Sequence, residues 1–177
     1  VSDFTYVWTH GIRADDNEKG STASDAATDG NVFNNFAYSA SNGHIGTNWN
    51  GHYKIIYDAN ELINAAMESG DTSEGTAINV AEAKVIRAFC FFELRRDYGE
   101  VPINLKTIDV PADEVAAKNT VAQVDAQIIK DLMESKDILP SQWASAYLGR
   151  ATSGLANALL AKLYLYQKDY VKSLQFA

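Results

Sequence analysis

Apolar residues recur at steps of three and four positions through residues 78–102, INVAEAKVIRAFCFFELRRDYGEVP. At this spacing one helix face carries Ala81, Val85, Ala88, Phe89 and Phe92. Phe91 and Leu94 widen that face, so we expect the helix to be packed on more than one side. The remaining strip is charged and consists of Glu82, Arg87, Glu93, Arg95 and Arg96.

The end of this helix is marked by charge and by backbone chemistry. Arg95 and Arg96 place positive charge in its last turns, where the helix dipole favours it. Gly99 can take the left-handed conformation that closes a helix, and Pro102 prevents the helix from resuming. We therefore expect an extended segment after residue 99.

Helical periodicity also appears before and after this stretch. The earlier helix has one face made of Trp49, Tyr53, Ile56, Tyr57, Asn60, Ile63 and Met67. The polar turn 69–76 would join it to the helix within 78–98 as a hairpin. Downstream, Thr120 and Gln123 match a capping box that starts an amphipathic helix. Its apolar stripe is Val121, Val124, Ile128 and Leu132.

These patterns predict an all-α, mostly helical single domain over residues 1–177. Residues 2–9 have helical spacing, and Gly11 is expected to end that helix. We expect a long loop at 11–48 with one short helical turn near 32–36, because glycine and small polar residues are dense there. The predicted segments that follow are a helical hairpin at 49–98, an extended connector at 99–119 and, at 120–177, a helix followed by a helical pair.

Composition narrows the function classes. The chain has 177 residues, 46% hydrophobic and 21% charged, which is ordinary for a globular domain with a core. Its net charge of −8 argues against a nucleic-acid partner, because few cations are available to neutralise phosphates. Cys90 is the single cysteine and lies among phenylalanines, so we interpret it as a small buried apolar residue.

Several separated stretches resemble one known family. The run 81–89, followed by Phe92 and Tyr98-Gly99-Glu100-Val101-Pro102, is similar to the central signature of the SusD/RagB family. The helix led by Trp49 and Tyr53, with Asn60 as its buried asparagine, also resembles the family pattern. Gly149-Arg150-Ala151-Thr152 and the helix after it are similar to a second recurring element. Within 160–177, the residues that resemble a tetratricopeptide repeat are Leu160, Ala161, Tyr164, Tyr170 and Ala177.

The resemblance implies tetratricopeptide-type helical hairpins with long irregular loops, in a nutrient-binding lipoprotein on the extracellular face of the Bacteroidetes outer membrane. Such a protein takes part in starch and polysaccharide utilisation. It captures an oligosaccharide, delivers it to a SusC-like TonB-dependent transporter and is not an enzyme. By the same resemblance we expect the chain to be an N-terminal to central part of a longer protein, with the signal and the lipid-bearing cysteine upstream. Two alternatives stay open: a RagB-like peptide cargo, and a tetratricopeptide adaptor that binds other proteins.

The residues themselves form no catalytic constellation. His10, His44 and His52 are the only histidines, and we expect His44 and His52 to be exposed, in a loop and at a helix start. The acidic run from residue 15 is a broken calcium loop, because Lys19 stands at the fifth ligand position and Ala26 replaces the bidentate glutamate. We therefore expect no catalytic residue, no metal and no cofactor.

Carbohydrate recognition needs flat aromatic faces and side chains that make paired hydrogen bonds to hydroxyls. The loop 14–50 supplies both. The candidate ligand-binding residues are Asp15, Asp16, Phe36, Tyr38, Asn42 and Trp49. The competing interpretation is structural, with Phe33 or Phe36 anchoring the loop and Trp49 packing within its own helix.

Overall fold

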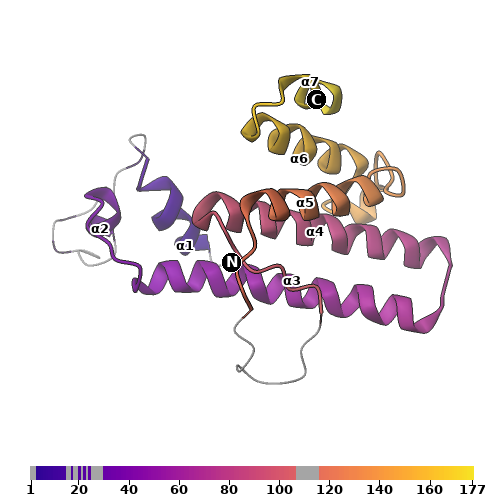
Figure 1. Ribbon diagram of the computed structural model, residues 1–177, viewed down its shortest axis with the longest axis horizontal. Coiled ribbons are helices and arrows are strands. Elements are labelled where there is room, and N and C mark those ends of the chain that lie inside the picture. Colours follow the sequence, from indigo (N-terminus) through magenta and orange to yellow (C-terminus); the bar gives the residue numbers. More distant parts are fainter. Residues whose placement is uncertain are drawn as a thin grey trace. The chain divides into compact units, whose positions relative to one another are not determined.

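The computed structural model describes residues 3–14, 17, 20, 22, 24, 30–106 and 116–177 (Figure 1). Across these ranges the regular secondary structure is helical, apart from one isolated antiparallel bridge between Val101 and Asn119. The helices are α1 (Asp3–Tyr6), α2 (Gly30–Asn34), α3 (Gly43–Ser69), α4 (Glu74–Tyr98), α5 (Val121–Ser135), α6 (Ser153–Tyr166) and α7 (Tyr170–Phe176), with a π-helical turn η1 (Val7–Gly11) and a 3-10 turn η2 (Ser145–Tyr147). The predicted all-α fold class is confirmed.

The chain divides into two compact units, Val1–Lys54 and Ile55–Ala177, and the boundary falls within α3. None of the helices in the described ranges is long and apolar enough to cross a membrane.

In the first unit, α1 continues directly into η1, which ends at Gly11 as predicted. The later helix α3 begins at Gly43, six residues before the predicted start at Trp49. The side chain of Asn42 explains this difference, because its Oδ1 accepts a hydrogen bond from the backbone N–H of His44 at 2.9 Å. Such a bond satisfies a free donor in the first turn of a helix. The predicted loop therefore ends at residue 42.

The second unit is a stack of helices in chain order. The part of α3 from residue 55 pairs with α4, and Ala59, Ile63 and Ala83 form a buried cluster between them. Helix α5 packs on α4, α6 packs on α5, and α7 packs on α6 (Figure 1). Each helix thus buries an apolar face against the next, which is how helical repeats build a continuous core.

The ends of α4 and the start of α5 follow their sequence signals. Ser73 caps the start of α4 by accepting from the N–H of Thr76. At the other end Gly99 has φ of 77°, and its N–H donates to the carbonyl of Arg95 at 3.1 Å. The predicted capping box of Thr120 and Gln123 at the start of α5 is present in both directions. The predicted end of α4 at Gly99 and the predicted capping box at the start of α5 are confirmed.

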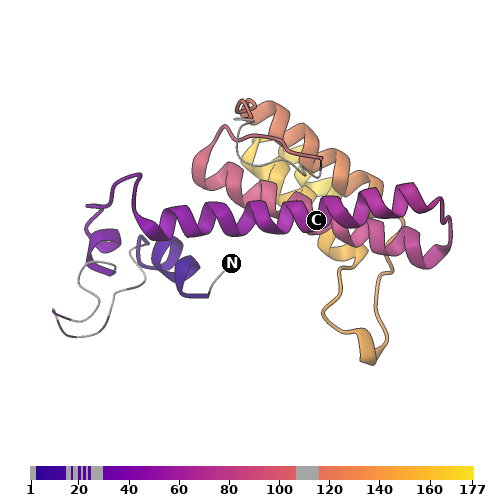
Figure 2. The ribbon, with the colours of Figure 1, turned by 90° about the horizontal axis from the view of Figure 1, so that it is seen from below.

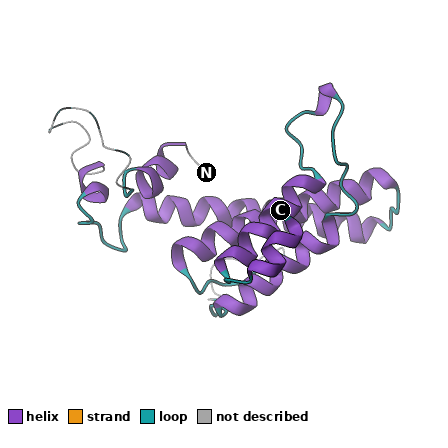
Figure 3. Ribbon diagram, turned by 90° about the horizontal axis from the view of Figure 1, so that it is seen from above, coloured by secondary structure: helices purple, strands orange, loops and turns teal. Residues whose placement is uncertain are grey.

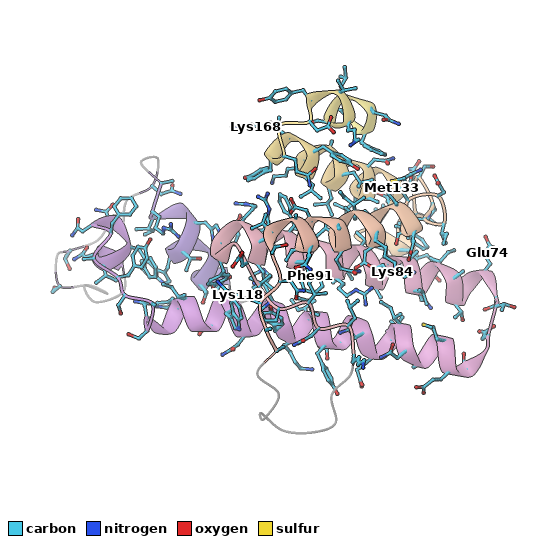
Figure 4. The ribbon with its side chains drawn as sticks, in the orientation of Figure 1. Glu74, Lys84, Phe91, Lys118, Met133 and Lys168 are labelled. Atoms are coloured by element: carbon cyan, nitrogen blue, oxygen red, sulfur yellow. The ribbon has the colours of Figure 1, made fainter. Side chains whose placement is uncertain are left out.

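The predicted division of α4 into apolar and charged faces is partly wrong. Phe91, labelled in Figure 4, is fully buried as expected, whereas Phe89 is 45% exposed. Arg87 and Glu93, which the sequence placed on the charged strip, are only 6% and 4% exposed. Arg87 can be buried because it forms an ion pair with Asp131 of α5 inside the unit.

The buried pair links three parts of the second unit. The Nε and Nη2 atoms of Arg87 donate to the two carboxylate oxygens of Asp131 at 2.9 and 2.7 Å. Its Nη1 donates to Oδ1 of Asn60 on α3 at 2.8 Å, and Nδ2 of Asn60 donates to the carbonyl of Asn104 at 2.9 Å. The predicted burial of Asn60 is confirmed.

Candidate ligand-binding site

An aromatic cluster holds the described part of the first unit together. Phe33 on α2 is fully buried, and its ring stacks on Tyr38 with the centroids 5.0 Å apart. The imidazole of His44 lies edge-on to Phe33 at 6.1 Å and also contacts the ring of Trp8 at 6.1 Å. These contacts join η1, α2 and the start of α3. Phe33 therefore anchors this region, as the structural interpretation of the sequence allowed.

Tyr38 is fixed by a second contact, which the sequence did not predict. The guanidinium carbon of Arg13 lies 5.3 Å from the centre of the Tyr38 ring, within the range of a cation–π contact. Arg13 is itself positioned, because its Nη1 donates to the carbonyl of Thr9 at 3.3 Å. The positions of Arg13 and Tyr38 in the sequence follow no helical or strand period, so their contact becomes visible only in the folded structure. The result is a half-buried tyrosine ring in a set orientation.

Phe36 has the opposite environment. Its side chain is 63% exposed, and its backbone has φ of 54°, a left-handed conformation that costs a non-glycine residue of order 1 kcal/mol. Two backbone hydrogen bonds hold this turn, from Phe36 N–H to the carbonyl of Phe33 and from Ala37 N–H to the carbonyl of Val32, the latter at 2.8 Å. The turn therefore presents a large apolar ring to solvent on a fixed backbone.

The other two candidates on described residues lie along α3. Asn42 uses its side-chain oxygen to start the helix, next to His44 of the aromatic cluster. Trp49 follows seven residues later, about 10 Å along the axis, where its ring contacts Tyr53 at 4.9 Å. Burial raises the pKa of the Tyr53 hydroxyl above its ordinary value.

The candidates Asp15 and Asp16 lie outside the described residues. The expectation for the histidines needs two corrections. His44 is half-buried in the first turn of α3 rather than exposed in a loop, and His52 is buried rather than exposed. Its Nδ1–H donates to the carbonyl of Asn48 one turn earlier, at 2.8 Å, which satisfies the ring within α3. In the second unit Cys90 is buried as expected, and burial raises the pKa of its thiol to about 12.

The described residues can bind a ligand by stacking and by hydrogen bonding. Phe36 offers an exposed ring, whereas the half-buried Tyr38 ring already contacts Phe33 and Arg13 and offers only the part that these contacts leave free. Aromatic rings of this kind cover the apolar face of a sugar or of a ligand side chain. Asn42 and Trp49 stand on the adjoining helix, so the loop candidates and the helix candidates belong to one unit.

Comparison with known proteins gives consistent matches. The family model described as starch-binding associating with outer membrane matches residues 6–165. A curated SusD-like protein of Formosa agariphila, P2, is 33% identical over 147 residues, which are 81% of this chain and 28% of that protein. The chain therefore spans little more than a quarter of the length of this relative.

Solved structures agree with the family match. A laminarin-binding SusD-like protein superposes with a TM-score of 0.78 at 27% identity, over 89% of this chain and 34% of that one. A structure determined with a xylogluco-oligosaccharide superposes with a TM-score of 0.74 at 27% identity, over 91% of this chain and 30% of that one. The chain belongs to the SusD-like family.

Proposed function

We propose that the protein captures oligosaccharides on the extracellular face of the outer membrane and delivers them to a SusC-like TonB-dependent transporter. The family description, starch-binding and outer-membrane associated, supports this role. Two of its structural neighbours are named for laminarin binding or were determined with a xylogluco-oligosaccharide. In this proposal a lipid at the N-terminus of the mature protein attaches it to the membrane, and the protein binds its cargo without catalysing a reaction on it.

The exposed ring of Phe36 is the observation that carries the proposal. An exposed aromatic side chain held on a left-handed backbone costs conformational free energy, and such an outlier motivates a hypothesis of function. Stacking on the apolar face of a sugar ring would be such a function. Tyr38 and Trp49 would extend the aromatic surface, and Asn42 with the acidic pair Asp15 and Asp16 would supply hydrogen bonds to hydroxyls.

Replacing Phe36 by alanine should weaken glycan binding by about threefold to tenfold, the range expected for one aromatic stacking contact. The ring is mostly outside the core, so helix content and the free energy of unfolding should stay at wild-type values. Titration calorimetry with laminarin and xyloglucan oligosaccharides measures the first effect, and circular dichroism measures the second.

Tyr170→Ala is the matched control, because Tyr170 is an equally exposed aromatic residue, 64% accessible, on α7 of the second unit. It should bind glycan as the wild type does. Tyr38→Ala should weaken binding in the same direction as Phe36→Ala. Wild-type affinity in both loop variants would remove this site from the proposal.

A further inference from the structure

Residues 141–149 form an arm that leaves the helices of the second unit between α5 and α6. Figure 2 shows it projecting from the helix layers, and Figure 3 shows the same excursion from the opposite side. Its only regular structure is the single turn η2. Tyr147 and Leu148 near its tip are 55% and 71% exposed.

The arm is closed by its own hydrogen bonds. At its base the N–H of Ser153 donates to the carbonyl of Pro140 at 3.0 Å, and the indole N–H of Trp143 donates to the carbonyl of Ala151 at 2.7 Å. Nearer the tip, the N–H of Tyr147 donates to the carbonyl of Ala144 at 2.8 Å. These bonds set the shape of the arm and tie its base to the start of α6, but they do not fix its direction relative to α4.

Glu82 on α4 supplies the contact that fixes this direction. Its two carboxylate oxygens accept from Nε of Arg150 at 3.1 and 3.0 Å, and Oε2 also accepts from Nη2 of Arg150. The backbone N–H of Ala151 donates to Oε1 at 3.1 Å, and Nη2 of Arg150 donates to Asn79 at 2.9 Å. The Trp143 ring lies 4.1 Å from the guanidinium carbon of Arg150, so the pair is also covered on one face. The hydrogen bond to Glu82 raises the pKa of Arg150.

The clamped residues also form a wall of a cleft. A cavity of about 580 Å³ lies between α3, α4 and the start of α6, and its floor is largely apolar, with Leu62, Ile86 and Leu155 among its lining residues. Residues 149–151 close one side of it, next to Glu82. Whatever holds Arg150 therefore also sets the width of this cleft.

We propose that the Glu82–Arg150 pair is a latch, which holds the arm against α4 and whose opening lets the arm swing as one piece and widens the cleft. The two residues come from the two separated sequence signatures, 81–102 and 149–152, so the latch joins them physically. The proposal concerns the second unit alone and does not depend on glycan capture by the first.

The test compares Glu82→Gln with the wild type in the full-length protein. Glutamine keeps the size of the glutamate side chain and one hydrogen-bond acceptor, but it lacks the negative charge that pairs with Arg150. The substitution therefore weakens the contact. We expect chymotrypsin to cut after Tyr147 or Leu148 about threefold to tenfold faster, and the amide of Ala151 to exchange hydrogen faster by a similar factor. The amides of α4 and α5 should exchange at wild-type rates, because the helices do not depend on the arm.

Glu134→Gln is the matched control, because it breaks another glutamate ion pair of the same unit, that with Lys84 at 2.8 Å, in which no residue of the arm takes part. It should leave cleavage of the arm unchanged. Should Glu82→Gln fail to fold, Arg150→Lys keeps the charge but cannot bond through two nitrogens, and it should accelerate cleavage in the same way. Wild-type cleavage in the folded latch variants, or faster exchange throughout α4 and α5, would overturn the latch.

Discussion

At the scale of single residues, two of the ion pairs between α4 and α5 in the second unit lie in contrasting environments. Arg87 and Asp131 are almost fully buried, and both guanidinium edges and both carboxylate oxygens are used. Lys84 and Glu134 lie on the surface of the same two helices, with 22% and 43% of their side chains exposed. The hydrogen bond from Lys84 lowers the pKa of Glu134. The two ion pairs therefore allow the contribution of a buried pair to stability to be compared with that of an exposed pair on the same two helices.

We predict that Asp131→Asn lowers the free energy of unfolding by about 3–5 kcal/mol, because it leaves the charge of Arg87 buried without a counterion. Glu134→Gln should cost at most about 1 kcal/mol, since solvent screens the exposed pair. Urea denaturation followed by circular dichroism measures both. Similar losses in the two variants would contradict the assignment of Arg87 and Asp131 as the central electrostatic contact of this unit.

Single residues also show which contacts could not be predicted from the sequence. The pattern of α4 placed Arg87 among solvent-exposed charges, since a lone arginine on a helix is usually solvated. Its partner Asp131 lies 44 positions away, and only the packing of α5 on α4 brings them together. The same limit applies to the candidate site. Arg13 and Tyr38 come from two sides of α2 in the sequence, and no periodicity relates their positions.

At the scale of elements, local signals were reliable wherever the chemistry acts within one turn. Gly99 ends α4 and Thr120 starts α5 at the predicted residues, because both effects depend on backbone groups nearby. The start of α3 was wrong by six residues, since Gly43 and Gly46 are poor helix formers and conceal the cap at Asn42. Long periodic helices were predictable from sequence, and a glycine-rich first turn was not.

Thr120→Ala should destabilise the protein by about 1 kcal/mol, because it removes the side-chain oxygen that accepts from the N–H of Gln123. Thr120→Ser keeps this hydroxyl and should remain close to the wild type. Hydrogen exchange should speed up mainly in the first turn of α5, since capping acts there. Equal stability of the alanine and serine variants would show that the capping box contributes little.

At the scale of the whole molecule, the two compact units have different roles in this account. The first carries the exposed Phe36 ring that is proposed to contact glycan. The second is a stack of helices that contains the buried Arg87–Asp131 pair and holds the arm through Glu82. Neither role requires a reactive group. The buried thiol of Cys90, with its raised pKa, is unsuited to act as a nucleophile.

The central claim is that the protein binds glycans and leaves them intact. Titration calorimetry of the full-length protein against a panel of oligosaccharides and peptides, with chromatography of every mixture afterwards, tests it most directly. The account predicts binding to one class of oligosaccharide, with the sugar recovered at its original length. Binding to peptides alone would contradict the proposed cargo, and shortened sugars in the mixtures would contradict the non-enzymatic role.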